Sequence, residues 1–342
     1  MTGPRVGLDA RLTKQMSVGM KTYAAELTAR LPRVAPDFTF VPFTRGTNFG
    51  WSEQVALPLA IGRARLDLVH FLSLYAPLLS PVRSVVTIHD LIHLRFPQYF
   101  KAKVRPYYQT AVRWACVRAR RVITDDERTI GDLREFLGVD PRKVRVVPLG
   151  VDERFLNAGT AERVPSPRRY FLYAGNHRRH KDLPTLFAAW SALGDETPID
   201  LYVTGPDDFG GELQRRRTPS RAIVALGDVS AAQLAGYYAG ALALVTPALR
   251  EGFGLPMLEA MASGCPVIAC ESAVPRVLAP AALTFAASDR ERLAARMRSV
   301  ASDEGLRDRL VKLGLEIARS LTWDRCAQAT ADVYREVLED AC

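Results

Sequence analysis

Two carboxylates eight residues apart, Glu251 and Glu259, are the residues of this 342-residue chain best placed to do chemistry. Glu251 opens a Gly-Phe-Gly turn, and a predicted helix begins at Leu255-Pro256, because proline suits the first helical turn. Glu259 lies one turn into this helix, on its Leu255 face. Since a helix N-terminus binds anions, the stretch could hold a phosphate on its amides and sugar hydroxyls on its carboxylates. A capped helix with two solvated acids is the alternative.

A cluster of cations follows an apolar run earlier in the chain. Gly175 ends a predicted strand, and His177, Arg178, Arg179, His180 and Lys181 precede the next predicted helix. Cations in this place offset the charge of a diphosphate, and glycine lets the backbone approach it. The two histidines have no carboxylate or cysteine at metal-ligand spacing, and no Asp-x-Asp pair offers a metal–diphosphate bridge. We therefore expect no obligatory metal and no other cofactor.

His89-Asp90 directly follows an apolar predicted strand. The segment His89-Asp90-Leu91-Ile92-His93 has the spacing of the HExxH zinc motif, but that motif needs a helix and here it continues a strand. His89 is a candidate for catalysis or substrate binding, with a surface loop histidine as the alternative. Gly19-Met20-Lys21-Thr22 lacks the spacing of a phosphate-binding P-loop. Gly19 could still begin either a binding loop or an ordinary helix.

Apolar strands alternate with helices along the whole chain, which predicts an α/β fold with parallel sheets. The expected strands are residues 5–9, 38–43, 67–71, 84–88, 121–124 and 144–147, then 170–174, 200–204, 222–226, 241–245 and 266–270. A stretch rich in Pro, Gly and charge, residues 158–169, reads as a linker. The sequence therefore predicts two Rossmann-like domains, residues 1–155 with the C-terminal helix 323–342, and residues 165–322.

Charge is concentrated in the first half of the chain. Residues 1–150 hold 23 Lys/Arg against 12 Asp/Glu, a net of +11, out of a total of +9. Residues 91–124 contain no acid and interleave eight cations, from Arg95 to Arg121, with aromatic side chains. Such a segment could stack nucleic-acid bases, lie on an anionic membrane, or be a helix packed through its aromatic face. Of the two binding partners, the composition favours the membrane surface over nucleic acid.

The five cysteines lack CxxC spacing and read as reduced thiols, and the N-terminus has no signal-peptide core. We therefore expect a cytoplasmic protein. The basic segment from Arg95 to Arg121 would bring it to the inner face of the membrane.

The segment from Glu251 to Gly264, EGFGLPMLEAMASG, resembles the Glu-x7-Glu signature of the family 4 retaining glycosyltransferases, which have the GT-B fold. The resemblance extends over nearly the whole length. It includes LGDV at residues 226–229, Gly175 with Lys181-Asp182-Leu183, TIHD at residues 87–90 and VPLGVD at residues 147–152. The family commonly has an Arg before the phosphate-loop lysine, where this chain has His180, so Arg178 or Arg179 would supply the charge.

The resemblance implies two domains facing across a cleft, with the last helix crossing back to the first domain. It makes Glu251, Lys181 and His89 the catalytic candidates. The donor-binding residues it implies are Gly19, Gly175, Asn176, Arg178, Arg179, Lys181, Gly205, Asp228, Val229, Glu251, Gly252, Phe253, Gly254, Leu255 and Glu259. His89, Asp90 and Lys21 would lie on the acceptor side.

The expected reaction is transfer of a sugar from a nucleotide-sugar, GDP-mannose first and a UDP-sugar second, to a lipid-linked or envelope glycan acceptor. A nucleotide-sugar epimerase or phosphorylase of the same fold is one alternative. A membrane- or nucleic-acid-binding protein without catalysis is another, although the intact Glu251, Glu259 and Lys181 argue against it.

Overall fold

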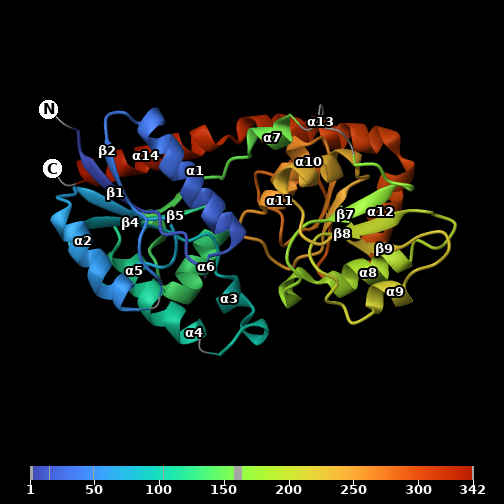
Figure 1. The fold of residues 1–342 in the computed structure, drawn as a ribbon, viewed down its shortest axis with the longest axis horizontal. Helices are drawn as coiled ribbons and strands as arrows, with labels where there is room; N and C mark the ends of the chain where they lie inside the picture. Colours follow the sequence, from blue (N-terminus) through green and yellow to red (C-terminus); the bar gives the residue numbers. More distant parts are fainter. Residues whose placement is uncertain (1–2, 15, 49, 103, 158–163, 341–342) are drawn as a thin grey trace. The chain divides into compact units, whose positions relative to one another are not determined.

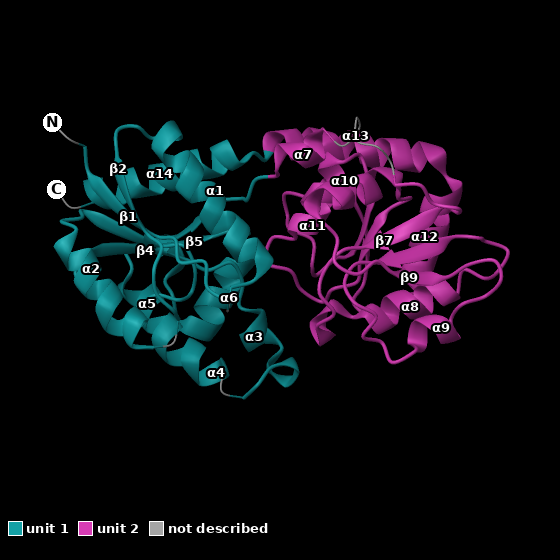
Figure 2. Cartoon of the chain, in the orientation of Figure 1, with its two compact units in different colours: residues 1–150, 321–342 teal, residues 151–320 magenta. Residues whose placement is uncertain are grey.

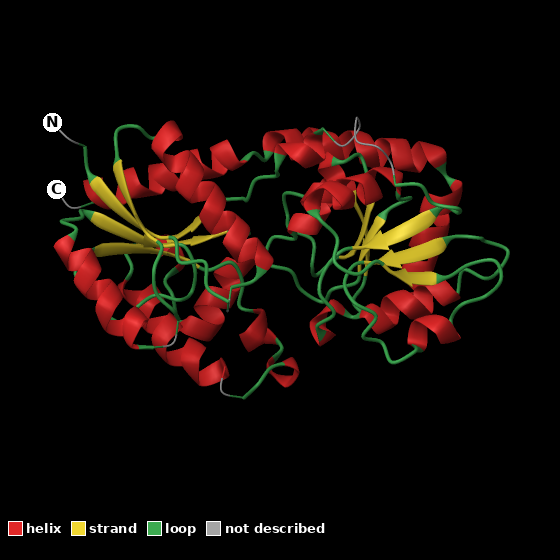
Figure 3. Ribbon diagram, in the orientation of Figure 1, coloured by secondary structure: helices red, strands yellow, loops and turns green. Residues whose placement is uncertain are grey.

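The computed structural model describes residues 3–14, 16–48, 50–102, 104–157 and 164–340. The chain divides into two compact units, Met1–Gly150 with Leu321–Cys342 (unit 1) and Val151–Ser320 (unit 2) (Figure 2). The predicted linker, residues 158–169, lies partly outside the described residues. In each unit a parallel sheet is flanked by helices (Figure 3).

Unit 1 is built on a six-stranded parallel sheet with the order β2-β1-β3-β4-β5-β6. Its strands are β1 (Arg5–Asp9), β2 (Thr39–Phe43), β3 (Leu68–Phe71), β4 (Arg83–Thr87), β5 (Arg121–Thr124) and β6 (Val144–Val146). All four residues of β3 are buried, as expected for a strand covered on both faces.

Helices cover this sheet on both faces (Figure 1). They are α1 (Val18–Val34), α2 (Leu57–Arg63), α3 (Ile92–Arg95), α4 (Val104–Tyr107), α5 (Arg113–Arg118), α6 (Arg128–Leu137) and the C-terminal α14 (Trp323–Glu339). A π-helical turn, Tyr108–Val112, joins α4 to α5. The predicted return of the last helix to the first domain is confirmed, because α14 belongs to unit 1.

Ion pairs fix α14 to unit 1. Asp324 at its start accepts from Arg30 of α1 at 2.7 Å, and Glu336 near its end pairs with Arg121 of β5 at 2.8 Å. Arg95, at the other end of the basic segment, pairs with Asp132 and Glu135 at 2.7 and 2.6 Å. Both ends of the acid-free segment are therefore neutralised by acids that lie far away in sequence, and the basic surface is smaller than the sequence indicated.

Unit 2 is a second six-stranded parallel sheet, with the order β12-β11-β10-β7-β8-β9. Its strands are β7 (Tyr170–Tyr173), β8 (Asp200–Val203), β9 (Ile223–Ala225), β10 (Leu244–Thr246), β11 (Val267–Cys270) and β12 (Ala282–Phe285). The strand β12, with the sequence ALTF, was not predicted, and three of its four residues are only half-buried. This architecture confirms the predicted α/β fold with parallel sheets.

The helices of unit 2 are α7 (Glu153–Leu156), α8 (Leu183–Ser191), α9 (Glu212–Arg215), α10 (Ala231–Gly240), α11 (Leu255–Ala262), α12 (Arg290–Ser302) and α13 (Glu304–Ser320). The last part of the chain thus forms three helices, α12, α13 and α14, of which α14 lies in unit 1.

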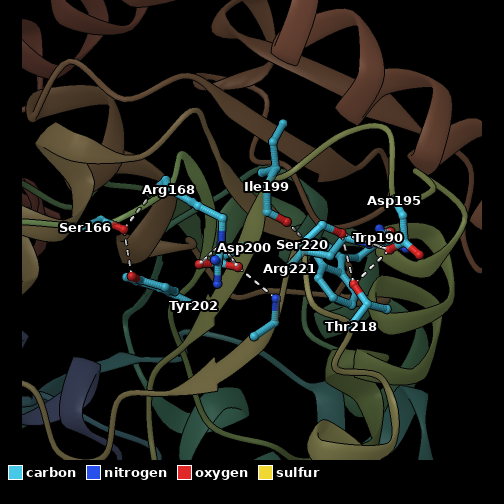
Figure 4. A network of polar contacts seen from close by, with 11 residues as sticks. Ser166, Arg168, Trp190, Asp195, Ile199, Asp200, Tyr202, Thr218, Ser220 and Arg221 are labelled. Carbon is cyan, nitrogen blue, oxygen red and sulfur yellow. Dashed lines mark hydrogen bonds and ion pairs between the residues drawn. The ribbon is translucent and has the colours of Figure 1, made fainter.

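A polar network holds the amino ends of β8 and β9 to the end of α8 (Figure 4). Asp200 accepts from Arg168 Nε and from the Ala222 amide at 3.0 and 2.8 Å. Arg221 donates to the Trp190 carbonyl at 2.7 Å and lies over the Trp190 ring. This network secures the edge of the sheet at which the strands begin, so the carboxyl edge is left to the loops described next.

Candidate functional site

The sheet order of unit 2 decides where a ligand can bind. β7, the first strand of the unit, is paired with both β8 and β10. The strands β8 and β9 therefore lie on one side of β7 and the later strands on the other, which makes the boundary between β7 and β10 the switch point of the strand order. In open parallel sheets, ligands bind outside the carboxyl ends of the strands at this switch point. The loops that leave there are residues 174–182 after β7 and 247–254 after β10, which are the two stretches that carry Lys181 and Glu251.

Lys181 and Glu251 lie in direct contact. The distance from Lys181 Nζ to Glu251 Oε1 is 2.5 Å, and their side chains are only 12% and 13% exposed. A second bond joins the same loops, since the Leu249 amide donates to the His180 carbonyl at 2.8 Å. The two predicted residues are thus held as one charged pair at the switch point.

The loop after β7 is shaped by its own hydrogen bonds. The Gly175 amide donates to Thr204 Oγ1 at 3.0 Å, and the Tyr173 hydroxyl donates to the Asn176 carbonyl at 2.5 Å. His177 lies between Asp208 and the Thr204 carbonyl, at 2.6 and 2.8 Å. The loop is therefore fixed to the ends of β7 and β8, and His177 serves this structure.

The cations of the loop divide into two kinds. His180 is buried, whereas Arg178 and Arg179 are exposed. Within the described ranges, neither arginine forms an ion pair, in contrast to Lys181. The guanidinium groups of Arg178 and Arg179, rather than His180, are the charges that a ligand can reach.

The helix α11 begins where the sequence predicted. Gly254 caps it with φ 75° and ψ 51°, a left-handed conformation that favours glycine. Pro256 follows in the first turn, where no N–H is needed. Gly252 is half-buried and Phe253 is buried beside this turn. Pro256 has no N–H, and the Met257 amide already donates to the Gly254 carbonyl at 2.8 Å. The Leu255 amide is therefore the first-turn group that could bind an anion.

Glu259, one turn into α11, is a carboxyl in an apolar setting. Burial raises the pKa of Glu259 to about 7, the Tyr238 hydroxyl bond at 3.3 Å partly offsets the rise, and the nearby Asp152 charge adds to it. A ligand hydroxyl that donates a hydrogen bond to the ionised carboxylate would stabilise that form and lower the pKa of Glu259.

The remaining predicted donor residues lie after β8 and β9. Gly205 has φ 92°, and a Cβ there would come within 3.1 Å of the His177 ring. Gly205 and Gly227 form an antiparallel bridge, which places Asp228 and Val229 directly after it. Asp228 is exposed and Val229 is half-buried. These turns continue the rim that starts at β7.

In unit 1, His89 follows β4 and contacts Asp125, which follows the neighbouring strand β5. The distance from His89 Nδ1 to Asp125 Oδ2 is 2.7 Å, and the Asp125 side chain is 1% exposed. Burial opposes the charge on the ring, but the Asp125 carboxylate outweighs it, so the pKa of His89 is raised. The carboxylate accepts a hydrogen bond from Nδ1–H and so orients the ring. Asp125 is a polar partner that the sequence reading missed, although its place after a strand was a usable signal.

A chain of buried hydroxyl and imidazole groups lies beneath His89. Thr87 Oγ1 contacts Tyr23 OH at 2.9 Å and His70 Nε2 at 2.8 Å, and His70 Nδ1 contacts Tyr334 OH at 2.6 Å. Burial lowers the pKa of His70 to about 3, so this ring is neutral. The network joins α1, β3 and β4 to α14 and fixes the strand that carries His89.

The other predicted unit 1 residues lie at helix starts. Ser17 caps α1 by accepting from the Met20 amide at 3.3 Å, so Gly19 and Lys21 lie in the helix itself. Gly19 therefore lies in the first turn of a capped helix, and its part in binding the donor stays a prediction. Asp90 Oδ1 accepts from the Ile92 amide at 3.0 Å and begins α3.

Two general features concern metals and membranes. In the part of the chain that the structure describes, no group of three His, Cys, Asp or Glu side chains is arranged to hold a metal ion. Among the same residues, no helix combines the length and the apolar character needed to cross a bilayer.

The comparisons with known proteins match both units. The model of "Glycosyltransferase Family 4" matches residues 19–155, and that of "Glycosyl transferases group 1" matches residues 168–303. The chain is 27% identical over 268 residues to O-antigen chain mannosyltransferase B of Escherichia coli, covering 74% of this chain and 70% of that protein.

Solved structures share the fold of this chain and confirm the predicted two-domain GT-B class. Sucrose-phosphate synthase from Thermosynechococcus elongatus matches with a TM-score of 0.77 at 19% identity, over 98% of this chain and 100% of that one. Anabaena Alr3699/HepE in complex with UDP-glucose matches with a TM-score of 0.72 at 15% identity, over 97% and 99%.

Proposed function

Because this chain belongs to the family 4 glycosyltransferases, we propose that it transfers a sugar from a nucleotide-sugar to a hydroxyl acceptor with retention of configuration. GDP-mannose is the first candidate donor, supported by the likeness to a mannosyltransferase. A UDP-sugar is the second, supported by a structural neighbour that was solved with UDP-glucose.

The contact between Lys181 and Glu251 carries this proposal for the donor site. An ammonium group has three N–H donors, so Lys181 can keep its bond to Glu251 while it binds a phosphate oxygen. Glu251 then faces the sugar hydroxyls beside the bond that breaks. The Leu255 amide at the start of α11 and the exposed Arg178 and Arg179 share the charge of the departing diphosphate. Preorganised donors of this kind each contribute about 3–4 kcal/mol to a transition state.

The nucleoside is proposed to lie toward Glu259 and the turn after β9. The ribose hydroxyls would donate to the Glu259 carboxylate, and the base would contact the backbone at Asp228 and Val229. Gly175, Asn176 and Gly205 allow the backbone to approach the ligand. The attack would come from the face that the diphosphate leaves, since among the described residues no second carboxylate pairs with Lys181 beside Glu251 to act as a nucleophile. We propose that the reaction needs no metal.

For the acceptor we propose His89, with Asp90 and Lys21 in the same unit. Orientation by Asp125 suits His89 to a hydrogen bond with an acceptor hydroxyl. The acceptor is proposed to be a lipid-linked or envelope glycan precursor at the cytoplasmic face of the membrane, which the likeness to an O-antigen mannosyltransferase supports.

The test begins with thermal unfolding in the presence of GDP, UDP, ADP and dTDP. Sugar transfer is then assayed with a nucleotide-sugar of the diphosphate that stabilises the protein most. The proposal expects stabilisation by GDP or UDP, and transfer that needs an acceptor. Normal transfer by both Glu251→Ala and Lys181→Ala would show that the site is assigned wrongly. Product formed from the donor alone would favour an epimerase.

A further inference from the structure

A cavity of about 250 Å³ lies in unit 1, lined by β4, the segment 77–82 and α5. Three arginines, Arg83, Arg118 and Arg120, contribute to its lining. Arg83 is the first residue of β4, whereas His89 follows the last, so six residues of extended chain separate them, roughly 20 Å. Arg83 begins β4 and Arg120 directly precedes β5, so the arginine end of the cavity lies at the edge of the sheet where the strands begin. The lining continues along the sheet to Val86 and Phe71, towards the carboxyl edge where the acceptor is proposed.

The three arginines carry uncompensated charge. Within the described residues no carboxylate pairs with Arg83, Arg118 or Arg120, whereas the neighbouring Arg121 is neutralised by acids of α14. The Lys143 ammonium adds a fourth cation, fixed at 2.6 Å from the Val117 carbonyl. Burial lowers the pKa of Lys143, and Arg120 and Arg121 lower it further, whereas Cys116 and the Asp140 carboxylate act to raise it.

Apolar side chains surround this cationic pocket. Leu78, Leu79, Trp114 and Val117 are 44%, 64%, 46% and 48% exposed. Trp114 Nε1 donates to the Leu78 carbonyl at 2.7 Å, which fastens α5 to the segment 77–82. The Arg118 guanidinium lies 5.5 Å from the Trp114 ring centre. The cations and the large apolar side chains therefore form one surface, which we call the arginine–tryptophan patch.

We propose that the arginine–tryptophan patch docks unit 1 on an anionic bilayer, with a lipid phosphate bound among Arg83, Arg118 and Arg120. Trp and Leu side chains insert at the boundary of head groups and acyl chains, while arginines bind the anionic head groups. The inference deepens the membrane contact proposed above and rests on it, but does not require sugar transfer. The sequence placed the basic surface between Arg95 and Arg121, both of which are ion-paired. The arginine–tryptophan patch keeps Arg118 and Arg120 of that segment and adds Arg83, which lies outside it.

The test is co-sedimentation of the full chain with phosphatidylcholine vesicles that contain either no anionic lipid or about 30% phosphatidylglycerol. The wild type should bind the anionic vesicles and lose binding as salt is raised. The triple variant R83Q/R118Q/R120Q should bind roughly 100-fold more weakly, because each cation near an anionic leaflet contributes about one kcal/mol. A matched variant, R292Q/R309Q/R319Q, removes the same charge from exposed positions of unit 2 and should bind like the wild type.

A second variant tests the apolar side chains. L79S/W114S keeps all the arginines and should also weaken vesicle binding. Equal losses in R292Q/R309Q/R319Q and R83Q/R118Q/R120Q would overturn the proposal, because net charge alone would then explain binding. So would stabilisation by inorganic phosphate without vesicle binding, or a preference for duplex DNA over vesicles.

Folding and the donor site are checked on the same samples. The arginine variants should keep the thermal unfolding midpoint of the wild type. L79S/W114S loses the bond from Trp114 to the Leu78 carbonyl and should unfold at a lower temperature, but every variant should keep the stabilisation by GDP or UDP. If nucleotide stabilisation persists while no variant changes vesicle binding, the patch assignment fails and the proposed donor site stands. If wild-type nucleotide stabilisation is absent while vesicle binding behaves as described, the donor site fails and the patch stands.

Discussion

Lys181 and Glu251 are seventy residues apart in the chain, yet their charged atoms are 2.5 Å apart at the switch point of unit 2. Both side chains are largely shielded from water, so neither charge is compensated by solvent alone. Removing one partner of such a pair leaves the other as a poorly solvated charge, which costs more than the pair itself contributes. The pair therefore makes the loops after β7 and β10 a single unit, on which the donor proposal depends.

Glu251→Gln removes the negative charge while it keeps the size of the side chain. We expect nucleoside diphosphate binding to persist, because Lys181 is then free to bind phosphate. Sugar transfer should fall roughly 100-fold or more, since the carboxylate that faces the sugar is lost. Steady-state transfer with the preferred donor, beside calorimetric binding of the diphosphate, separates the two effects. Glu196→Gln, at an exposed position of the same unit, is the control and should leave both unchanged.

Glu259 makes stability depend on pH. Its pKa is raised from 4.5 to about 7, so the folded chain holds a proton that the unfolded chain releases in this window. The stability should therefore fall by roughly 3 kcal/mol as the pH rises from 4.5 to 7. Glu259→Gln removes this loss and should be more stable than the wild type above pH 7. Urea unfolding at several pH values measures it, and the exposed Glu291→Gln should retain the wild-type slope.

The same carboxyl should couple nucleotide binding to pH. A ribose that donates to the ionised Glu259 lowers its pKa, so affinity for the nucleoside diphosphate should increase as the pH rises through 7. Because the terminal phosphate also titrates near pH 6, Glu259→Gln serves as the reference. An identical pH dependence in the two proteins would remove Glu259 from the nucleotide site.

Asp125→Asn tests the orientation of His89. Without the carboxylate, burial is opposed only by the smaller effects of Asp90 and the Leu72 backbone, so the pKa of His89 should fall. In the wild type, the protonated pair stabilises unit 1 fully below pH 6.5, and this contribution is lost as the pH rises through the raised pKa. Proton NMR titration of the His89 ring measures the shift, and the pH profile of transfer should move with it. Asp126→Asn keeps the His89–Asp125 contact and should leave the pKa of His89 unchanged.

Tyr334→Phe removes the hydroxyl that contacts His70 at 2.6 Å. The buried imidazole loses a partner, so the free energy of unfolding should fall by about 1–3 kcal/mol. Because His70 is neutral, with a pKa of about 3, this loss should be the same from pH 5 to 8. Denaturant unfolding checks it against Tyr237→Phe in unit 2. A loss that vanishes at low pH would mean that His70 is charged.

The sequence signals of the proposed donor loops are local. A glycine before a cationic run and a carboxylate one turn into a helix each lie within a dozen residues, and the order of strands then brings both loops to one edge. Asp125 was missed although it follows β5 as His89 follows β4, because recognising the pair requires knowing that the two strands are neighbours.

The basic segment shows what a linear reading cannot supply. The acids that neutralise Arg95 and Arg121 lie on α6 and α14, the latter some two hundred residues away. Arg83 completes the arginine–tryptophan patch from outside the segment, through a cavity that only side-chain packing defines. Charge composition therefore indicated a basic surface but could not say which arginines remain available on it.

The central claim is that the loops after β7 and β10 bind the diphosphate of the donor through Lys181. Calorimetric titration of Lys181→Met with UDP and GDP tests it most directly, with the exposed Lys312→Met as the matched control. The account predicts that Lys312→Met binds like the wild type. It predicts that Lys181→Met binds roughly 100-fold more weakly, since one charge-assisted contact of this kind contributes about 3 kcal/mol. Unchanged diphosphate affinity in a folded Lys181→Met protein would contradict it.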